Sequence, residues 1–510
     1  MINPTAAVCV GSMFAAAHVT DLAVNDDLDD LFYLPRQTYN HLCGAAPNRK
    51  RVVVLGSGWG ALSFVRKLDP MYFDVTIVSP RNYFFYTPLL AGVTTSTVKA
   101  HSVLEAVRQT KPMPYANFLK AECTSLDPAN KLVSLEGHGI SVDLPYDHLV
   151  CAVGAQPNTF GIPGVQENAM FLKELDHGLA VRHRILDRLE RAMIAHAAGR
   201  MDEVRRLLSI VVVGGGPTGV EFAAEVADLM NSDLKRSFPV VADQIRLTLV
   251  EAQSDLLTMF KKSIGEHVKQ HLESVGVTVR TQTMVKSVDD VSIDLNTTAG
   301  DSETMDYGLL VWVAGVGARP ITKKLAAAFG QSNPRGLEID QFLRVKGAEE
   351  NTVFALGDCT VSRNPWTAQV AAQQGKYLAR AFRDEEANAS LPFEYCHQGT
   401  MAYVGEGKSV AVLSPPNLDT VTKGFARVSF FRSLASCPDS MLKPEHRTGV
   451  PVVTPEKKFE INVLGMSGFA VWRGVYFSKL FSYSNRFNVA TDWVRNFFFG
   501  RKVAESAEIS

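Results

Sequence analysis

Two glycine-rich segments constrain this chain more than any other feature. The first reads VVVLGSGWGALSFVRKL (residues 52–68) and the second reads VVVGGGPTGVEFAAEV (residues 211–226). Each has a β-branched run, then closely spaced glycines, then apolar residues at helical spacing, which predicts a strand, a tight turn and a helix. In such a βαβ unit the glycines let the backbone approach a pyrophosphate, which the helix N-terminus attracts. Two of these segments predict two dinucleotides bound side by side, with electrons passing between them.

The first segment carries the fingerprint without its usual acidic partner. Its fingerprint positions are taken by Gly56, Gly58 and Ala61, with Gly60 as a further small residue. The next strand should end in a carboxylate for ribose hydroxyls, yet Ser79, Pro80 and Arg81 stand there. Asp358, at the end of a buried strand pattern, would instead accept a hydrogen bond from a ribityl hydroxyl. The small residues around Gly154 resemble the second crossover of flavoproteins. We therefore expect FAD as the first ligand; the alternative is a generic βαβ turn.

The second segment matches the fingerprint fully. Its glycines are Gly214, Gly215, Gly216 and Gly219. The strand that follows ends in Glu251, and a carboxylate there accepts a hydrogen bond from the ribose 2′-hydroxyl and repels a 2′-phosphate. This residue therefore favours NADH over NADPH. The alternative is that the second unit is a duplicated fold element without a ligand.

Length and charge limit the classes of protein to consider. A chain of 510 residues is too long for one core and predicts two or three domains. Its formal charge of −1 argues against nucleic acid as a partner. No apolar run reaches the length of about 18 residues that would predict a transmembrane helix. Residues 1–48 have an acid-free start but then five aspartates and a single arginine, a poor match to a transit peptide. They form either a leader or a disordered or loosely docked extension.

Alternating strand and helix patterns predict an α/β fold with two Rossmann-type dinucleotide-binding domains. Strand patterns fall at residues 74–78, 148–154, 246–252 and 307–316 and near 351, and helical patterns at 174–206 and 368–382. The expected order is an N-terminal leader or extension (1–48), the first part of the FAD-binding domain (49–205), the NADH-binding domain (206–320), the second part of the FAD-binding domain (321–400) and a C-terminal membrane-anchoring and dimerisation region (401–510).

The C-terminal tail, residues 472–502, has an amphipathic helical pattern. Apolar residues recur at steps of three or four, at Trp472, Tyr476, Leu480, Tyr483, Phe487, Ala490, Val494 and Phe497. The tail's six basic residues, against the single acid Asp492, are Arg473, Lys479, Arg486, Arg495, Arg501 and Lys502. Aromatic residues on one face of a helix and cations on the other suit an anionic membrane surface. The alternative is a helix docked on the protein's own core or on a second subunit.

The cysteines bear on where the electrons of a reduced flavin would go. Seven cysteines are scattered along the chain without CxxC spacing, which predicts neither a redox-active pair nor a disulfide framework. Flavoproteins of the lipoamide dehydrogenase and thioredoxin reductase types pass electrons to such a pair. We therefore expect the flavin to reduce an incoming acceptor directly: a quinone, oxygen or a one-electron protein.

Taken together, these motifs resemble the type II, non-proton-pumping NADH:quinone oxidoreductases of the mitochondrial type. The resemblance covers roughly residues 49–500, and its most diagnostic part is VSPRNYFFYTPLL (residues 78–90). The other matching parts are VVVLGSGWGA, GGGPTGVEFAAEV, ALGDC, TAQVAAQQGKYLA and the aromatic tail. The same resemblance accounts for the missing carboxylate, because mitochondrial-type members look like this chain at Ser79.

The resemblance implies which residues would hold the two dinucleotides. Non-covalently bound FAD would contact Gly56, Gly58, Gly60, Ala61, Ser79, Arg81, Thr87, Pro88, Gly154, Gly357 and Asp358. Among these, Thr87 and Pro88 would lie close to the isoalloxazine ring. NADH, the electron donor, would contact Gly214, Gly215, Gly216, Gly219, Glu221, Glu251 and Gly315.

The resemblance also implies a catalytic acid and a quinone site. Glu221 corresponds to the family's glutamate near the flavin and nicotinamide, and a carboxylate buried there should have a raised pKa and relay a proton. The alternative is an acid that interacts with the helix dipole. The residues at the quinone would be Gln369, Gln373 and Lys479, of which Lys479 could equally be a snorkelling surface lysine. Ala372 is a departure, since some members carry a histidine there.

The implied activity is hydride transfer from NADH to FAD, followed by two-electron reduction of ubiquinone. Such an enzyme is rotenone-insensitive, pumps no protons and needs no metal. We expect a peripheral protein of the mitochondrial inner membrane that forms a homodimer. The first alternative is a flavoprotein of the ferredoxin-reductase or apoptosis-inducing-factor type with a non-quinone acceptor. The second is a redox sensor or scaffold that retains both dinucleotides.

Overall fold

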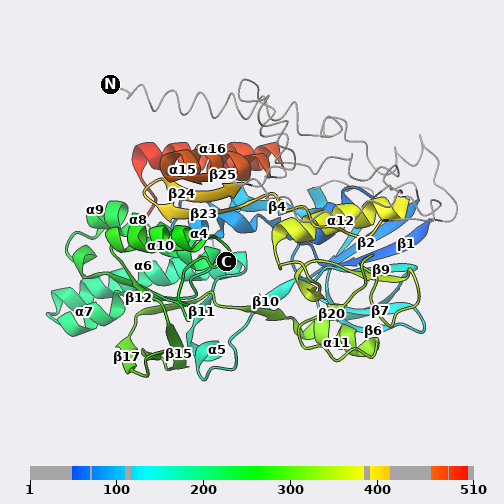
Figure 1. Ribbon diagram of the computed structural model, residues 1–510, viewed down its shortest axis with the longest axis horizontal. Coiled ribbons are helices and arrows are strands. Elements are labelled where there is room, and N and C mark those ends of the chain that lie inside the picture. The colour runs from blue at the N-terminus through cyan, green and yellow to red at the C-terminus, as the bar shows by residue number, and fades with distance from the viewer. Residues whose placement is uncertain are drawn as a thin grey trace, which may run out of the picture.

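Two five-stranded parallel sheets form the framework of the protein (Figure 1). The computed structural model describes residues 49–68, 72–109, 116–383, 391–413, 461–480 and 482–503. The extension expected at residues 1–48 lies outside these residues. As the sequence patterns predict, each glycine-rich segment contributes a strand to one of the two sheets, and the fold is α/β.

The first sheet has the strand order β21–β9–β1–β2–β5. Its strands are β21 (Val353–Ala355), β9 (His148–Cys151), β1 (Lys50–Leu55), β2 (Phe73–Ser79) and β5 (Ala116–Lys120). Side chains alternate along β1, so Val52 and Val54 face one core while Val53 and Leu55 face another. Because both faces are covered, this strand reads as a continuous apolar run.

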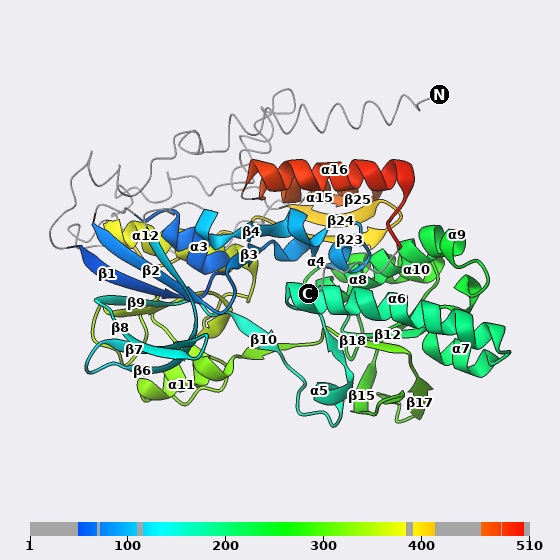
Figure 2. The same ribbon diagram turned by 180° about the vertical axis from the view of Figure 1, so that it is seen from behind.

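Different elements cover the two faces of the first sheet (Figure 2). On the face of Val52 and Val54 lie helices α3 (Trp59–Val65) and α12 (Ala368–Arg383). On the opposite face lie helix α11 (Pro320–Ala328) and the antiparallel strands β6 (Glu122–Asp127), β7 (Leu132–Gly137) and β8 (Ile140–Pro145).

The second sheet has the order β11–β18–β12–β13–β14. Its strands are β11 (Met170–Phe171), β18 (Leu309–Trp312), β12 (Ser209–Val213), β13 (Arg246–Val250) and β14 (Val277–Arg280). One face packs on helices α6 (Leu175–Ala197), α8 (Pro217–Leu229) and α10 (Lys262–Ser274). The other face packs on the antiparallel strands β15 (Thr283–Val288), β16 (Ser292–Thr297) and β17 (Ser302–Asp306).

The helical pattern at residues 174–206 forms two helices rather than one. Helix α6 ends at Ala197, and α7 (Met201–Leu207) begins after a turn. The turn contains Gly199 with φ of +71°, a left-handed conformation that glycine adopts without a steric cost. This glycine therefore ends the first helix, in the manner of a C-terminal cap.

The chain crosses between the two sheets through a two-stranded antiparallel ribbon. Strand β10 (Ala155–Pro157) leads into the second sheet, and β19 (Val316–Ala318) pairs with it on the way back. The returning chain forms the short parallel pair β20 (Leu337–Glu338) and β22 (Thr360–Val361) and adds β21 to the first sheet. The two glycine-rich turns are thereby held in one body.

A third layer lies over the junction of the two sheets (Figure 2). It consists of the antiparallel strands β23 (Thr400–Gly405), β24 (Lys408–Leu413) and β25 (Ile461–Leu464), then helices α15 (Gly465–Ser478) and α16 (Tyr483–Phe499). Among the described residues, none of the helices is long and apolar enough to cross a membrane.

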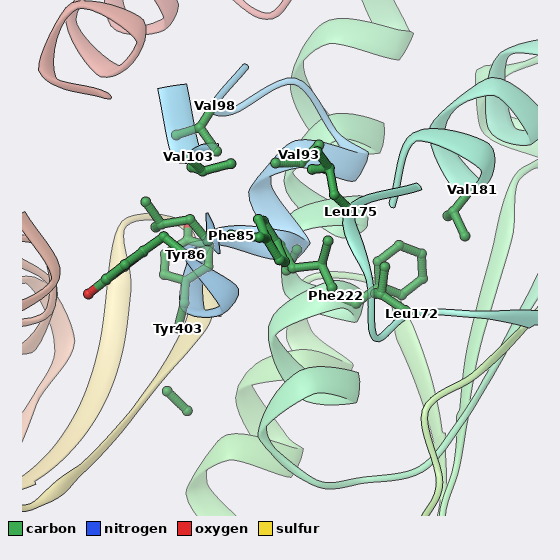
Figure 3. Close-up of a cluster of buried hydrophobic side chains, with 14 of the residues drawn as sticks. Phe85, Tyr86, Val93, Val98, Val103, Leu172, Leu175, Val181, Phe222 and Tyr403 are labelled. Atoms are coloured by element: carbon green, nitrogen blue, oxygen red, sulfur yellow. The ribbon is translucent and has the colours of Figure 1, made fainter. Parts of the chain in front are cut away.

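The segment at residues 83–106 joins these layers. It forms β3 (Tyr83–Phe85), the 3₁₀ turn η2 (Thr87–Leu89), α4 (Leu90–Thr94), the 3₁₀ turn η3 (Ala100–Val103) and β4 (Leu104–Ala106). Figure 3 shows Phe85 and Val93 of this segment beside Phe222 of α8 and Leu175 of α6, in one buried cluster. The diagnostic sequence block is therefore core of the junction as well as a stretch of the site described below.

Candidate active site

The first glycine-rich turn forms a cradle at one edge of its sheet. Gly56 has φ of +112°, and a Cβ there would lie 2.3 Å from the Ala152 carbonyl oxygen, so no other residue fits. Gly58 precedes α3, and a Cβ at Gly58 or at Gly154 would meet no atom within 4 Å. Because β21, β9 and β1 are parallel neighbours, the turns after all three share one edge. This open, side-chain-free edge fits a pyrophosphate with its ribityl chain.

Asp358 follows β21 at the same edge. It lies in the 3₁₀ turn η7 (Gly357–Cys359), with its side chain 19% exposed and Oδ2 3.6 Å from Lys173 Nζ. The Gly357 amide donates to Oε1 of the fully buried Gln374 of α12, 2.7 Å away. Gly60 allows α3 to approach this turn, because a Cβ there would lie 2.1 Å from Leu356 Cδ1; Ala61 beside it is fully buried.

Ser79 and Arg81, at the end of β2, have different surroundings. Ser79 is buried, and its Oγ lies 3.0 Å from Ser57 Oγ in the glycine-rich turn. Arg81 instead forms an ion pair with Glu174, which also binds Arg319 Nη2 at 2.6 Å. The Arg81 guanidinium is therefore directed at the start of α6, where the two sheets meet.

The second glycine-rich turn repeats this geometry. Gly214 has φ of +120°, and a Cβ at Gly219 would lie 1.8 Å from the Gly214 carbonyl oxygen. Gly216 precedes α8, and a Cβ there would meet no atom within 4 Å. The 13 residues of α8 direct its N-terminal amides at this open space. The turn therefore fits a second pyrophosphate.

Glu251 and Gly315 flank the second turn on the neighbouring strands. The Glu251 carboxylate accepts from the Gly215 amide at 2.5 Å and from the Gln253 amide at 2.7 Å. The Glu251 carboxylate thus holds the turn in place through these two hydrogen bonds. It also lies at the position from which it would contact a ribose. Gly315 has φ of +70° with the Phe160 ring 2.3 Å from a Cβ placed there, so a side chain is excluded.

Glu221 is the fifth residue of α8 and lies beyond its first turn, which weakens an interaction with the helix dipole. It is 9% exposed, and its Oε1 accepts a hydrogen bond of 3.2 Å from the Tyr403 amide. Burial is the main cause that raises the pKa of Glu221, hydrogen bonds from the Tyr403 amide and the Trp472 side chain lower it, and the nearby Glu225 raises it; the net pKa is about 8. The carboxyl is therefore mostly protonated at neutral pH.

Thr87 and Pro88 bring the diagnostic block to the same place. Trp59, the first residue of α3, donates from Nε1 to Thr87 Oγ1 at 3.0 Å and contacts the Phe84 and Tyr86 rings. Pro88 and Glu221 line the same cavity of about 70 Å³. The structure therefore joins the turn of the first sheet, the block and α8 around Glu221.

The residues expected at the quinone lie around the segment that precedes β23. Gln369 donates to the Gly399 carbonyl at 2.8 Å, and its Oε1 accepts from Tyr395 Oη at 3.2 Å. Lys479 donates from Nζ to Gln398 Oε1 at 3.2 Å, and burial lowers the pKa of Lys479 to about 8. Because the Gln398 backbone amide also donates to Gln369 Oε1 at 3.4 Å, one chain of hydrogen bonds joins α12 to Lys479, directly after α15.

Gln373 lies on the same helix but is turned to the backbone. Its Nε2 donates to the Cys396 carbonyl and its Oε1 accepts from the Cys396 amide, at 2.8 and 3.0 Å. The NH₂ and the carbonyl of the Gln373 side chain thus both anchor the segment before β23. Tyr395 and Gln398, which complete this cluster, carried no motif that sequence reasoning could use.

The described cysteines include no activated thiol. Cys151 and Cys359 are buried, free thiols whose pKa values burial raises, that of Cys359 to about 11, so neither is a ready nucleophile. Cys123 is free and half-buried, with a pKa that burial also raises to about 11. Cys396 is disulfide-bonded, which the scattered spacing did not predict.

The tail divides into inward and outward residues. Trp472, Leu480 and Ala490 are buried, whereas Phe487 and Phe497 are 67% and 71% exposed. A break after α15 separates the two helices, so the apolar residues do not follow a single stripe.

The tail's cations also differ from the amphipathic pattern. Arg486 is buried and donates to the carbonyls of Leu480 and Ser478, and Arg501 binds acidic residues of the second domain. The expectation of a cationic outer face is therefore wrong for these two residues, because they satisfy polar groups inside the protein.

Comparison with known protein families agrees with this geometry. The model of the pyridine nucleotide-disulphide oxidoreductase family matches residues 50–375, and an NDH2 C-terminal domain model matches residues 452–502. A probable mitochondrial NADH-ubiquinone oxidoreductase of Schizosaccharomyces pombe is 36% identical, over 90% of this chain and 84% of that relative. An external alternative NADH-ubiquinone oxidoreductase of Yarrowia lipolytica mitochondria is 34% identical, over 90% and 81%.

Solved structures give the same result. NDH2 of Plasmodium falciparum in complex with NADH matches with a TM-score of 0.77 and 25% identity, over 90% of this chain and 100% of that one. The sulfide:quinone oxidoreductase of Aquifex aeolicus, at 15% identity and a TM-score of 0.62, shares the fold.

Proposed function

The chain belongs to the type II NADH:quinone oxidoreductases, within the pyridine nucleotide-disulphide oxidoreductase family, and we propose on this premise that it transfers electrons from NADH to ubiquinone. The observation that carries the proposal is the placement of Glu221. This buried carboxyl lies on the helix of the second glycine-rich turn and shares a cavity with Pro88 of the diagnostic block. No proton pumping is proposed, and rotenone would not inhibit the reaction.

We assign the two dinucleotides to the two cradles. FAD would occupy the first, formed by residues 49–205 and 321–400, and NADH the second, formed by residues 206–320. Support comes from the open space at Gly58, Gly154 and Gly216, where side chains would block a pyrophosphate. When bound, FAD supplies the hydride-accepting N5 and returns two electrons to the acceptor. The protein itself would hold the nicotinamide and isoalloxazine rings next to each other in the orientation that hydride transfer requires, and it would exclude water.

Glu221 would handle the proton that quinone reduction requires. Ubiquinone takes up two electrons and two protons, and the hydride of NADH supplies the electrons with one proton. Because the pKa of Glu221 is about 8, its carboxyl is protonated at neutral pH and able to donate the second proton to a quinone oxygen. The Tyr403 amide holds Oε1 in place for this step.

The quinone headgroup would contact Gln369 and Lys479. Their link through Gln398 places an amide and an ammonium group in one hydrogen-bonded cluster. Gln373 would contribute indirectly, because its amide already holds the Cys396 backbone at the edge of that cluster.

The C-terminal region, residues 401–510, would bind the membrane and a second subunit. Support comes from the exposed large apolar residues on α15 and α16, which are Met466, Tyr483, Phe487, Phe497, Phe498 and Phe499. Exposed aromatic side chains of this kind suit insertion into the headgroup region. We propose a peripheral site on the mitochondrial inner membrane, as the mitochondrial relatives suggest.

A half-reaction experiment tests the proposal. The FAD-loaded protein is mixed without oxygen first with NADH and then with a short-chain ubiquinone, while flavin absorbance is followed. We expect NADH to bleach the flavin and ubiquinone to restore it within the turnover time. Bleaching followed by recovery with a one-electron protein acceptor, but not with ubiquinone, would favour a ferredoxin-reductase or apoptosis-inducing-factor type of enzyme instead.

A further inference from the structure

A cavity lined by apolar and charged residues lies behind Glu221, on the side of the tail. Its volume of about 70 Å³ is bounded by the segment from Pro88 to Val98, α8, Tyr403, α15 and Arg501. Val98 and Tyr403 are labelled in Figure 3. The charged residues of its lining are Glu221, Glu225, Arg473 and Arg501. A water molecule takes about 30 Å³ in the liquid, so there is room for about two.

One buried donor in the cavity wall requires a partner. Arg473 Nε is buried without a hydrogen-bond partner among the residues that the structure describes, whereas the neighbouring Trp472 side chain acts as a donor to Glu221. The Arg473 guanidinium lies 4.3 Å from the centre of the Phe469 ring and 4.6 Å from that of the Trp493 ring, which shield it from solvent. Because buried polar groups are nearly always bonded, we expect ordered water in this cavity.

Glu225 lies one turn beyond Glu221 on α8, and it differs from Glu221 in being paired with a cation. Its Oε2 accepts from Thr95 Oγ1 at 2.9 Å and Thr97 Oγ1 at 2.5 Å, and Arg501 Nη2 lies 3.2 Å away. Arg501 is 12% exposed on its side chain, so the ion pair is poorly screened. Two hydroxyl groups and the Arg501 guanidinium contact the Glu225 carboxyl group, whereas Glu221 has the Tyr403 amide and the Trp472 side chain as donors and no cation bound to it.

We propose that water in this cavity hydrogen-bonds Glu221 to Glu225, and that Glu225, held by Arg501, is the positioning residue that sets the proton affinity of Glu221 and reloads it from that water. The inference rests on the proposed role of Glu221. The overall reaction is NADH + H⁺ + quinone → NAD⁺ + quinol. In it the O–H bond of Glu221 breaks, an O–H bond forms on the quinone, and one proton from solvent restores Glu221 through the cavity water.

The charges around Glu221 fix the direction of each effect. Glu225 raises the pKa of Glu221. Arg473 and Arg501 line the same cavity, and cations there favour the ionised form. Tyr403 and Tyr476, from β23 and α15, stay neutral because burial raises both of their pKa values. Loss of the charge at Glu225 should therefore lower the pKa of Glu221.

Infrared titration tests the link without NADH or quinone. In the full-length, FAD-loaded protein, the C=O band of protonated Glu221 is identified by its loss in Glu221→Gln and followed against pH. We expect Glu225→Gln to lower the midpoint by about 1 pH unit, as for removal of one nearby like charge. The double variant Glu225→Gln/Arg501→Gln should return towards the wild-type midpoint. A midpoint that does not change in Glu225→Gln would overturn the proposal.

Asp233→Asn is the matched control. Asp233 lies just after the same helix, with Oδ2 3.6 Å from Arg501 Nη1, but does not line the cavity. We expect its Glu221 midpoint to equal that of the wild type. An equal shift in both variants would show that loosening of Arg501, rather than the water link, is responsible, and the proposal would fail.

Gly92→Ala tests the water without altering a charge. A Cβ at Gly92 would lie 3.3 Å from Val98 Cγ2, 3.5 Å from Thr97 Cβ and 3.7 Å from Glu225 Oε1, all of which belong to the cavity wall. We expect slower quinone reduction with a larger solvent deuterium isotope effect, while flavin reduction by NADH is unchanged. An isotope effect equal to that of the wild type would contradict the proposal. If wild-type protein fails to reduce quinone, the proposed function fails, whereas the infrared result stands by itself.

Discussion

Glu221→Gln should make the protein more stable while it removes the proposed proton donor. In the folded protein the pKa of Glu221 rises from 4.5 to about 8 because burial disfavours its charge. Between those two pH values the unfolded chain has released this proton while the folded protein retains it. Stability therefore falls as pH rises through this window, and glutamine, which cannot ionise, removes the penalty.

The magnitude follows from the shift. With about 1.36 kcal/mol per pKa unit, the penalty is about 2 kcal/mol at pH 6 and about 4 kcal/mol at pH 8. Unfolding of roughly 500 residues carries about 1 kcal/mol per kelvin of entropy, so Tm should rise by about 2 °C at pH 6 and about 4 °C at pH 8. The Tyr403 amide keeps its acceptor, since the glutamine carbonyl replaces Oε1.

Thermal unfolding of the FAD-loaded protein across pH 5–9 measures this effect. The exposed Glu190 of α6 provides the control, and Glu190→Gln should give the wild-type Tm at every pH. The reasoning is refuted if Glu221→Gln is no more stable than the wild type at pH 8, or if its advantage does not grow between pH 6 and pH 8.

Three further substitutions probe the two cradles and the quinone cluster. Gly219→Ala should abolish NADH binding, measured by calorimetry with FAD retained, because its Cβ would lie 1.8 Å from the Gly214 carbonyl oxygen. Glu251→Ala should narrow the preference for NADH over NADPH by at least about tenfold in kcat/KM, since repulsion of a 2′-phosphate is lost; an unchanged ratio would remove Glu251 from nucleotide selection. Lys479→Met should raise the KM for ubiquinone several-fold while the rate with ferricyanide stays constant, because its ammonium group binds Gln398 in the proposed quinone site; equal losses with both acceptors would indicate a structural role.

Much of the framework was predictable from local pattern. The runs that became β1 and β12 are β-branched on both faces, and parallel strands buried on both sides require that composition. The glycines of both turns were predictable because their positive φ or close contacts exclude other residues. The role of Glu221 was predictable only through the family resemblance, which aligns it with a glutamate directly after the second fingerprint.

The tail was less predictable, because its partners are distant in sequence. Its apolar periodicity runs through the break between α15 and α16, so pattern alone predicts one helix. Arg501 pairs with Glu225, 276 residues earlier, and Asn496 donates to the Thr97 carbonyl, 399 residues earlier. Spacing along the chain carries no information about such distant partners. The pattern of basic residues in the tail is equally compatible with cations that face the protein interior and cations that face solvent.

The cluster proposed to bind the quinone shows the same limit of sequence-based prediction. Spacing placed Gln369 and Gln373 on one helix, which the structure bears out, but their amides bind backbone carbonyls before β23. Side-chain amides satisfy buried backbone groups as readily as they bind ligands. The sequence could not distinguish these two uses.

Steady-state oxidation of NADH by purified protein of known FAD content tests the central claim most directly. Rates are compared with a short-chain ubiquinone, without an acceptor, and with NADPH in place of NADH. The account predicts rapid turnover that requires the quinone and prefers NADH. Turnover that does not depend on quinone, or none at all despite full FAD occupancy, would contradict it.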